Sequence, residues 1–329
     1  LNFIFSFIFS FFAIKFKFVD KPSSRKTHIG EVPLVGGLSI YSVLLTSIFI
    51  FNFSYLEKII ILYSLIILLL GMFDDIFNLR VSLRLLILTL ASLLLVGSGL
   101  EINDLGGYFL FKPIELHSFS ILFTFICVIG LTNAFNFIDG IDGLCSGSLL
   151  ISFLSLLLFS IYFNTNINYF QFDLLIVLSI SLVIFLIFNL SLFKINKIFL
   201  GDAGSMSLGF ILGFLLIYYS QNEKFIHPII TVWCVTLPVY DLIAVIFFRL
   251  INKSNPFKSD RKHLHHVIIR SGLSDSITLS IILFVSTFLN FIGFIVFIYF
   301  GPVESLLLFI FLFLIYFFAV YYINKSVKV

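Results

Sequence analysis

Residues 118–163 read SFSILFTFICVIGLTNAFNFIDGIDGLCSGSLLISFLSLLLFSIYF. Two apolar runs, each long enough to cross about 30 Å of hydrocarbon as a helix, flank a short segment in which Asn133, Asn136, Asp139 and Asp142 recur at every third position. This period turns the four side chains toward one side of a helix end. The stretch therefore predicts two membrane helices with a polar site between them.

The composition of the whole chain leads to the same class of protein. The 329 residues are 60% hydrophobic and 11% charged, with a mean hydropathy of +1.16. A soluble globular domain carries about 25% charged residues. We therefore expect an all-α, polytopic integral membrane protein. Cys127, Cys145 and Cys234 form no pair motif, so neither a disulfide framework nor a zinc site is indicated.

Apolar runs of similar length recur along the chain. They lie at about 1–18, 35–52, 57–73, 83–100, 118–136, 145–163, 171–193, 206–220, 227–248, 277–300 and 305–322. We expect about eleven transmembrane helices, or ten if the first run does not cross. No linker or soluble domain interrupts them, so residues 1–329 are predicted to form a single domain.

The positive charges orient these helices. Lysines follow the first run and no positive charge precedes it, the reverse of a secretory signal peptide. We therefore expect a retained helix with its N-terminus outside. With eleven crossings, Lys58, Lys112 and Lys224 lie outside and the other lysines and arginines lie on the inner side, as the positive-inside rule requires. The C-terminus is then cytoplasmic.

The same topology places five polar segments on the cytoplasmic face. They lie at about 20–37, 73–84, 132–145, 194–206 and 249–276. A channel or carrier would distribute polar residues through the membrane midplane. Their concentration at one interface indicates chemistry on a lipid head group with a substrate that arrives from the cytoplasm.

Acidic residues stand out in these segments. Asp74 and Asp75 are adjacent, and neighbouring carboxylates repel unless a cation or a proton relieves them; a solvated helix end is the alternative. Asp139 and Asp142 either line a site or cap the following helix, with the glycine after each ending the preceding one.

The motif LGDAGS precedes another apolar run. Ser205 is a candidate N-cap for the helix that follows. Backbone N–H groups near Asp202 could also receive an anion, because a helix N-terminus favours negative charge.

Basic side chains complement the acids. They are Arg25, Lys26 and His28 near the N-terminus and Arg261, Lys262, His263, His265 and His266 in a later loop. Contact with anionic lipid would explain basic loops, but not three histidines within four residues, which are largely neutral at pH 7. H-x-H-H could ligate a metal, although the carboxylates suit a hard ion better. Acids for Mg²⁺ and bases for phosphate together indicate phosphoryl transfer with a nucleotide pyrophosphate.

In combination these motifs resemble those of the polyprenyl-phosphate N-acetylhexosamine-1-phosphate transferases, the MraY/WecA superfamily or glycosyltransferase 4 family, and within it the WecA type. The matching stretches, in the family's order, are DKPSSRKTHIGEVPLVGG from residue 20, GMFDDIFNLR from 71, NAFNFIDGIDGL from 133, FLGDAGS from 199, LPVYD from 237 and NPFKSDRKHLHHVIIRSGLS from 255. The last two apolar runs carry no motif.

The resemblance implies a bacterial cytoplasmic (inner) membrane enzyme whose active site faces the cytoplasm. It implies transfer of N-acetylglucosamine-1-phosphate from UDP-GlcNAc to undecaprenyl phosphate, with release of UMP and a requirement for Mg²⁺ or Mn²⁺. This is the first membrane step of O-antigen or related surface-glycan synthesis. The expected partners are the UDP-N-acetylhexosamine, undecaprenyl phosphate and membrane lipids, without nucleic acid and with a homodimer by analogy.

The resemblance also implies roles for residues. Asp202 is the expected direct Mg²⁺ ligand, with Asp74 and Asp75 beside the metal and the lipid phosphate. Asp139, Asp142 and His263 complete the catalytic candidates, and the substrate-binding candidates are Arg25, Lys26, His28, Asn78, Asn133, Asn136, Asn189, Arg261, His265 and His266. Asn78 departs from the family, which often has a third aspartate there. Asp241, in LPVYD, is expected to be structural or to line the site.

Several alternatives remain open at this stage. The donor could be another UDP-N-acetylhexosamine, such as the GalNAc or a deoxy-hexosamine form, or UDP-MurNAc-pentapeptide as in the MraY reaction. MraY-like chains, however, carry a different histidine loop. A polyprenol-lipid transporter would share the hydropathy without needing the acidic set, and a membrane phosphatase would work without a divalent ion.

Overall fold

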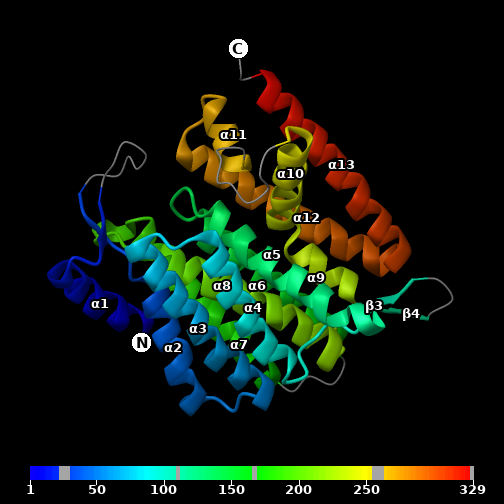
Figure 1. Cartoon of the computed structure of the whole chain (residues 1–329), viewed down its shortest axis with the longest axis horizontal. Coiled ribbons are helices and arrows are strands. Elements are labelled where there is room, and N and C mark those ends of the chain that lie inside the picture. Colours follow the sequence, from blue (N-terminus) through cyan, green and yellow to red (C-terminus); the bar gives the residue numbers. More distant parts are fainter. Residues whose placement is uncertain (22–29, 109–111, 165–168, 254–262, 327–329) are drawn as a thin grey trace.

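The computed structural model describes residues 1–21, 30–108, 112–164, 169–253 and 263–326, which are largely helical (Figure 1). The α-helices are α1 (Asn2–Phe16), α2 (Gly36–Ile50), α3 (Tyr55–Phe77), α4 (Val81–Val96), α5 (Ser120–Ile138), α6 (Leu144–Phe163), α7 (Asp173–Asn189), α8 (Gly201–Ile217), α9 (Pro228–Cys234), α10 (Thr236–Ile251), α11 (Leu264–Arg270), α12 (Asp275–Phe300) and α13 (Pro302–Ser326). Short helical turns are η1 (His117–Phe119), η2 (Tyr169–Phe172), η3 (Leu192–Lys194) and η4 (Tyr218–Asn222), the last a π-helical continuation of α8.

Every predicted apolar run forms helix, but the runs differ in length. In the described part of the chain, α3, α5 with η1, α6, α8 with η4, α12 and α13 are long and apolar enough to cross a membrane, and α9 with α10 is a seventh if this bent pair is one span. The apolar helices α1, α2, α4 and α7 have 15 to 17 residues, which at 1.5 Å per residue is about 22–26 Å. The fold is thus that of an all-α membrane protein with six or seven candidate spans, and eleven crossings remain a prediction.

Helix α8 lies at the centre of the bundle. All of its residues from 203 to 217 are buried, and α2, α3, α5 and α6 pack around it. Glycines permit the closest approaches: a Cβ on Gly37 would lie 2.4 Å from the nitrogen of Gly204, and one on Gly71 would lie 2.4 Å from the backbone of Ala203. These contacts bring the C-terminal end of α3 against the first turn of α8, where the acidic motifs meet.

Helix boundaries correct two sequence expectations. Helix α3 continues to Phe77, beyond the predicted end of its apolar run at 73, so Asp74 and Asp75 lie on its last turns. Helix α8 begins at Gly201, so the GDAGS motif forms its first turn. Ser205 is therefore not the N-cap; its hydroxyl donates to the carbonyl of Gly201 within the helix.

The structure also adds elements that hydropathy did not predict. Two short antiparallel strand pairs form, β1 (Val19–Asp20) with β2 (Val32–Pro33) and β3 (Asp104–Gly107) with β4 (Pro113–Glu115). The loop expected at 249–276 contains α11. The single helix expected at 227–248 is broken at Val235 (φ −127°, ψ 25°), and α9 and α10 meet at 82°.

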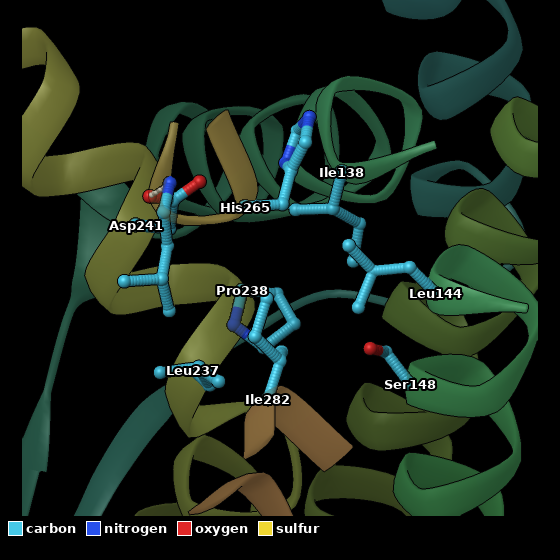
Figure 2. Close-up of a pocket in the computed structure, with 9 residues that line it drawn as sticks. Ile138, Leu144, Ser148, Leu237, Pro238, Asp241, His265 and Ile282 are labelled. Atoms are coloured by element: carbon cyan, nitrogen blue, oxygen red, sulfur yellow. Dashed lines mark hydrogen bonds between the residues drawn. The ribbon is translucent and has the colours of Figure 1, made fainter. Parts of the chain in front are cut away.

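Beyond this break, α10 reaches the ends of the two helices that flank residues 139–143, which we call the DGIDG loop. Leu237, Pro238 and Asp241 of α10 face Ile138 at the end of α5 and Leu144 at the start of α6 (Figure 2). His265 of α11 closes the same small cavity, whose volume is about 20 Å³. Helices α10 and α11 therefore border the polar segment that connects α5 with α6.

Candidate active site

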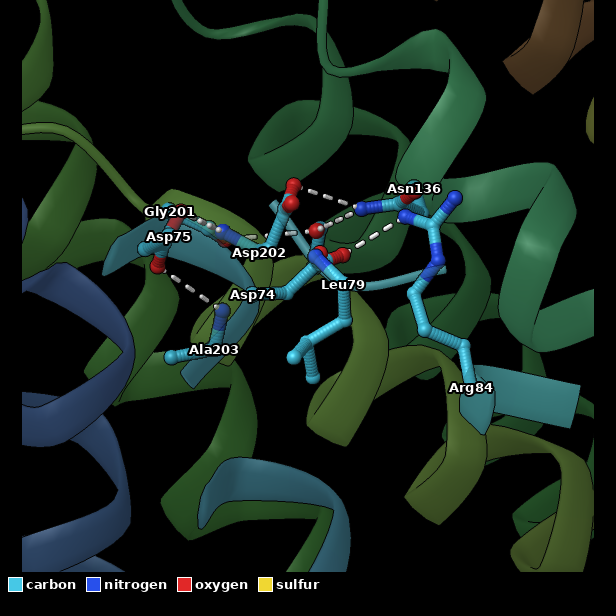
Figure 3. Close-up of polar contacts among 9 residues, drawn as sticks. Asp74, Asp75, Leu79, Arg84, Asn136, Gly201, Asp202 and Ala203 are labelled. Carbon is cyan, nitrogen blue, oxygen red and sulfur yellow. Dashed lines mark hydrogen bonds and ion pairs between the residues drawn. The ribbon is translucent and has the colours of Figure 1, made fainter. Parts of the chain in front are cut away.

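Three helix ends bring the acidic motifs together. Asp74 and Asp75 come from the end of α3, Asn136 from the end of α5 and Asp202 from the first turn of α8 (Figure 3). Asn136 Nδ2 donates to Asp202 Oδ1 at 2.8 Å and to Ser205 Oγ at 3.0 Å. The amide therefore orients the carboxylate that was expected to bind the metal.

Asp75 caps helix α8 from outside that helix. Its carboxylate accepts the backbone N–H of Asp202 at 3.0 Å and that of Ala203 at 3.3 Å. These N–H groups have no partner within their own helix, and the positive end of the helix dipole favours a negative charge there. Gly201 makes this approach possible, because its φ of +73° suits glycine and a Cβ would lie 2.8 Å from Asp75 Oδ2.

Asp74 has a different set of partners. Its side chain is 4% exposed, accepts the N–H of Leu79 at 2.7 Å and pairs with Arg84 Nη1 of α4 at 2.6 Å. It also interacts directly with the carboxylate of Asp202. Two carboxylates this close need a cation or a shared proton between them, and Arg84 supplies only part of the required positive charge.

Asp139 follows α5 at the edge of this cluster. Its side chain retains solvent access, yet the surrounding protein desolvates the carboxylate, and repulsion by Asp202, Asp75 and Asp142 adds to the effect; the pKa of Asp139 is raised to about 8. The group therefore holds a proton near neutral pH that a cation in the cluster would displace.

Asp142 lies one turn further on and has its own cation. It pairs with Lys197, whose Nζ lies 5.0 Å from the centroid of the Phe199 ring. A polar pocket of about 200 Å³ adjoins this pair, with Asn189 and Asp275 among its lining residues. The pocket gives the acid cluster a polar extension toward the N-terminal end of α12.

Asn189 supports this region through the backbone. Its Oδ1 accepts the N–H of Gly143 at 2.6 Å and its Nδ2 donates to the carbonyl of Ile198 at 2.9 Å. The side chain is 5% exposed. It thus ties the DGIDG loop to the segment that leads into α8, and its proposed contact with uracil stays a prediction.

The histidine loop is held by Asp241. One carboxylate oxygen bonds His263 Nδ1 at 2.7 Å, and the other accepts the N–H of Leu264 and the hydroxyl of Tyr316 of α13, both at 2.9 Å. His263 and Asp241 are 5% and 3% exposed. Of the two roles expected for Asp241, this geometry supports the structural one, because the carboxylate orients a candidate catalytic histidine.

His265 connects the histidine loop with the acidic loop. Its ring lies so close to Gly140 that a Cβ there would be 2.1 Å from His265 Nε2. This nitrogen is buried and has no hydrogen-bond partner among the described residues. Burial, together with His266, lowers the pKa of His265 to about 3, so the imidazole is neutral. The His266 ring lies beside it, tilted by 44°, with centroids 4.0 Å apart.

The remaining candidates lie apart from this cluster or outside the described residues. Asn78 ends α3 with a φ of +48°, its N–H bonded to the carbonyl of Asp74. Asn133 donates to the carbonyl of Ile129 in its own helix at 2.7 Å. Arg25, Lys26, His28 and Arg261 lie outside the described residues.

Sequence reasoning missed three partners of the acids: Arg84, Lys197 and Tyr316. Arg84 and Lys197 lie inside the polar segments 73–84 and 194–206, so their positive charge near an acidic motif was a usable signal. Tyr316 lies in an apolar run without any motif and gave none.

The donor atoms suit a hard divalent cation. Among the described residues, no three His, Cys, Asp or Glu side chains are arranged to enclose a metal ion. Mg²⁺, however, is usually held by one or two carboxylates with water and substrate phosphates as its other ligands. The adjacent carboxylates of Asp202 and Asp74 match that requirement.

Comparison with known proteins places the chain among membrane glycosyl transferases. Residues 58–220 match the model of glycosyl transferase family 4. The undecaprenyl-phosphate alpha-N-acetylglucosaminyl 1-phosphate transferases of Yersinia pestis and Escherichia coli K12 are both 31% identical, over 88% of this chain and 81% of their own length. A probable undecaprenyl-phosphate N-acetylglucosaminyl 1-phosphate transferase of Bacillus subtilis is 29% identical over 82% of this chain and 75% of its own. These matches confirm the resemblance inferred from the motifs.

Proposed function

Because the chain belongs to the undecaprenyl-phosphate alpha-N-acetylglucosaminyl 1-phosphate transferases of glycosyl transferase family 4, we propose that it transfers N-acetylglucosamine-1-phosphate from UDP-GlcNAc to undecaprenyl phosphate and releases UMP. The observation that carries this proposal is the meeting of Asp74, Asp75, Asn136 and Asp202 at three helix ends. A transporter would not require such a cluster of carboxylates at one end of its helices.

An apolar cavity supports a lipid acceptor. It has a volume of about 440 Å³ and lies between α5, α8, α9 and α10, with Val128, Leu131, Val232 and Leu242 among its lining residues. Leu131 precedes Asn136 by five residues of α5, about 7.5 Å along the helix axis. A polyprenyl chain in this cavity would have its phosphate close to the acid cluster.

The reaction then needs little proton transfer. The second pKa of a phosphate monoester is near 6, so the acceptor is already a dianion at pH 7. One of its oxygens attacks the sugar-linked phosphorus of the donor, forming a new P–O bond while the P–O bond to UMP breaks. Positioning and charge neutralisation supply most of the rate enhancement.

Different residues of the chain would bind the metal, the acceptor phosphate and the donor. Asp202, oriented by Asn136, and Asp74 would hold Mg²⁺ or Mn²⁺, which when bound neutralises charge that builds on the phosphates toward UMP. Arg84, paired with Asp74, would contribute its guanidinium to the acceptor phosphate. His263, held by Asp241 and lying beside Phe137 near the end of α5, would contact the sugar-phosphate of the donor.

The nucleotide half of the donor fits the polar side of the site. The pocket of about 200 Å³ beside Asp142 and Lys197 offers two carboxylates, one ammonium group, an amide and two serine hydroxyls. We place the site on the cytoplasmic face of a bacterial inner membrane, in a chain of eleven crossings with its N-terminus outside. This orientation gives UDP-GlcNAc direct access from the cytoplasm.

A transfer assay tests the proposal. Detergent-purified protein is supplied with undecaprenyl phosphate and Mg²⁺, and with UDP-GlcNAc, UDP-GalNAc or UDP-MurNAc-pentapeptide separately, while UMP and the lipid product are followed. We expect UMP release and lipid product with UDP-GlcNAc alone. Turnover with UDP-MurNAc-pentapeptide only would assign the MraY reaction instead. If a folded sample releases no UMP and forms no lipid product with any of the three donors, the result would favour the transporter or a deoxy-hexosamine donor.

The metal assignment has its own control. Asp202→Asn keeps the size of the side chain and removes its charge, so we expect transfer to be abolished while the thermal unfolding of the detergent-purified protein changes little. Substantial retained activity would overturn the assignment of Asp202 as the metal ligand.

A further inference from the structure

The break between α9 and α10 leaves backbone groups that need partners. In a membrane-spanning segment no water satisfies such groups, so side chains must do so. The carbonyl of Cys234, at the break, accepts Nδ2 of Asn290 from α12 at 3.2 Å, and Asn290 Nδ2 also reaches Ser155 Oγ at 3.0 Å. The hydroxyl of Thr236 donates to the carbonyl of Trp233 at 2.8 Å.

Trp233 fastens the same break to α12 and α13. Its indole Nε1 donates to Ser305 Oγ at 2.8 Å. The ring is fully buried and lies against Gly293, where a Cβ would be 1.9 Å from the indole. The bend is thus held by three side-chain hydrogen bonds, donated by Asn290, Thr236 and Trp233, and by one close ring contact.

Packing alone does not account for an asparagine at position 290. The side chain is 1% exposed, and its Oδ1 is buried without a partner among the described residues. A buried amide with an unsatisfied oxygen costs stability, whereas an apolar side chain of similar size would not. The reason for an asparagine at position 290 is therefore the hydrogen bond that its Nδ2 donates to the carbonyl of Cys234 at the break.

Helix α10 has two different faces beyond the bend. Val239 and Leu242 line the apolar cavity proposed for the acceptor chain. Asp241, between them, holds His263 and the N–H of Leu264. The angle at Val235 therefore sets the width of the acceptor cavity and the placement of the histidine loop together.

We propose that Asn290 is a positioning residue for the lipid acceptor: it fixes the bend between α9 and α10, so that α10 shapes the cavity for the polyprenyl chain while holding His263 at the reacting phosphates. The inference rests on the proposed function. It assigns discrimination for the long acceptor to a residue of the apolar run 277–300, which carries no motif.

The test compares acceptors of different length. Asn290→Leu is assayed with undecaprenyl phosphate and with a short-chain prenyl phosphate that does not fill the cavity, at fixed UDP-GlcNAc. We expect kcat/KM for the long acceptor to fall about tenfold, the scale of one lost buried hydrogen bond, mostly through KM. With the short acceptor we expect only the smaller fall in kcat that a displaced His263 causes for both acceptors, so its kcat/KM should fall clearly less than that of the long acceptor. An equal fall for both acceptors, or no change for either, would overturn the inference.

Companion variants separate positioning from folding. Ser155→Ala removes the other partner of Asn290 and leaves the bond to Cys234, so it should retain wild-type kinetics. Ser305→Ala releases Trp233 from the opposite side of the bend and should give the same acceptor-specific change as Asn290→Leu, while Asn290→Gln should recover part of the loss. If the wild-type protein transfers no sugar phosphate at all, the proposed function fails; if it does and these variants show no acceptor-specific effect, only the positioning role fails.

Discussion

The two members of the aspartate pair are neighbours in the chain but perform different tasks. Asp75 neutralises the N-terminus of α8, while Asp74 pairs with Arg84 and faces Asp202. Successive residues of a helix project about 100° apart, so a motif that reads as one unit is divided between two surroundings. Asp74 is therefore the member that we propose to share a cation with Asp202.

Arg84 should matter as much as the acids it accompanies. Arg84→Ala leaves the buried carboxylate of Asp74 beside Asp202 without its cation, and breaking a buried ion pair costs about 3–5 kcal/mol, somewhat less here because the arginine is partly exposed. We expect a lower midpoint of thermal unfolding and a loss of transfer activity of roughly 10²-fold. Arg80→Ala removes the same charge from an exposed position of the same segment and should change neither. Equal effects of the two variants would contradict a specific role for Arg84 as the cation of Asp74.

Metal binding should release protons because of Asp139. Its pKa of about 8 in the metal-free protein means that the carboxyl is largely protonated at pH 7, and a cation near Asp202 stabilises the ionised form. Mg²⁺ affinity should therefore rise as pH increases from 6 to 8. Isothermal titration in buffers of different ionisation enthalpy should show release approaching one proton per ion at pH 7. Asp139→Asn should abolish most of that proton release. An unchanged number of protons released per ion would contradict the raised pKa of Asp139.

Residue types and spacing were enough to predict part of this site. Asp202, Asp74, Asn136 and Asp139 meet because each stands near a helix end on the same side of the bundle, which hydropathy and motif order already indicated. The individual partners could not be predicted. Whether Asn189 faces a ligand or the backbone depends on distances of a few ångströms between loops, and no local pattern encodes them.

At the scale of helices, the approach of α3 to α8 decides whether the site forms. Gly71→Ala places a methyl group against the backbone of Ala203, which cannot rotate away. The helices must separate, with a cost of about 1–3 kcal/mol, and Asp75 then moves from the first turn of α8. We expect a lower unfolding midpoint together with reduced transfer. Gly213→Ala, whose nearest contact for a Cβ is 3.6 Å, serves as the stability control and should leave the midpoint unchanged or slightly raised. A tolerated Gly71→Ala would show that the close approach is not required.

Hydropathy predicted where the helices lie but not how they bend. The run at 227–248 is apolar enough to be predicted as one helix, and at its interruption at Val235 it is held by Asn290, Ser305 and Gly293 of later helices. Pro238 is a local signal for this break, because it has no N–H for the carbonyl of Cys234 four residues earlier. The side chains that satisfy this carbonyl and hold Trp233 lie more than fifty residues away in the chain. The glycines of the VGG and GDAGS motifs carry information that hydropathy does not use, since two small residues at facing positions permit close helix packing.

At the scale of the whole molecule, the proposed chemistry requires one orientation in the membrane. The DGIDG loop contacts His265 of α11, and α11 lies away from β3 and β4 (Figure 1). If the cluster faces the cytoplasm, the β3–β4 hairpin must face outside. The distribution of lysines and arginines led to the same assignment independently, because it placed Lys112 of this hairpin among the few outer charges.

Accessibility labelling tests this orientation with two matched substitutions. Lys112→Cys and Lys253→Cys place thiols at exposed positions of the hairpin segment and of the end of α10, in a background where Cys127, Cys145 and Cys234 are replaced by serine. A membrane-impermeant maleimide added to intact spheroplasts should modify the cysteine at 112 and leave the one at 253 unmodified, and inside-out vesicles should give the reverse pattern. Labelling of position 253 in intact spheroplasts would place the acid cluster outside. UDP-GlcNAc is made in the cytoplasm and carries charges that do not cross the bilayer, so that result would contradict the proposed donor as well as the orientation.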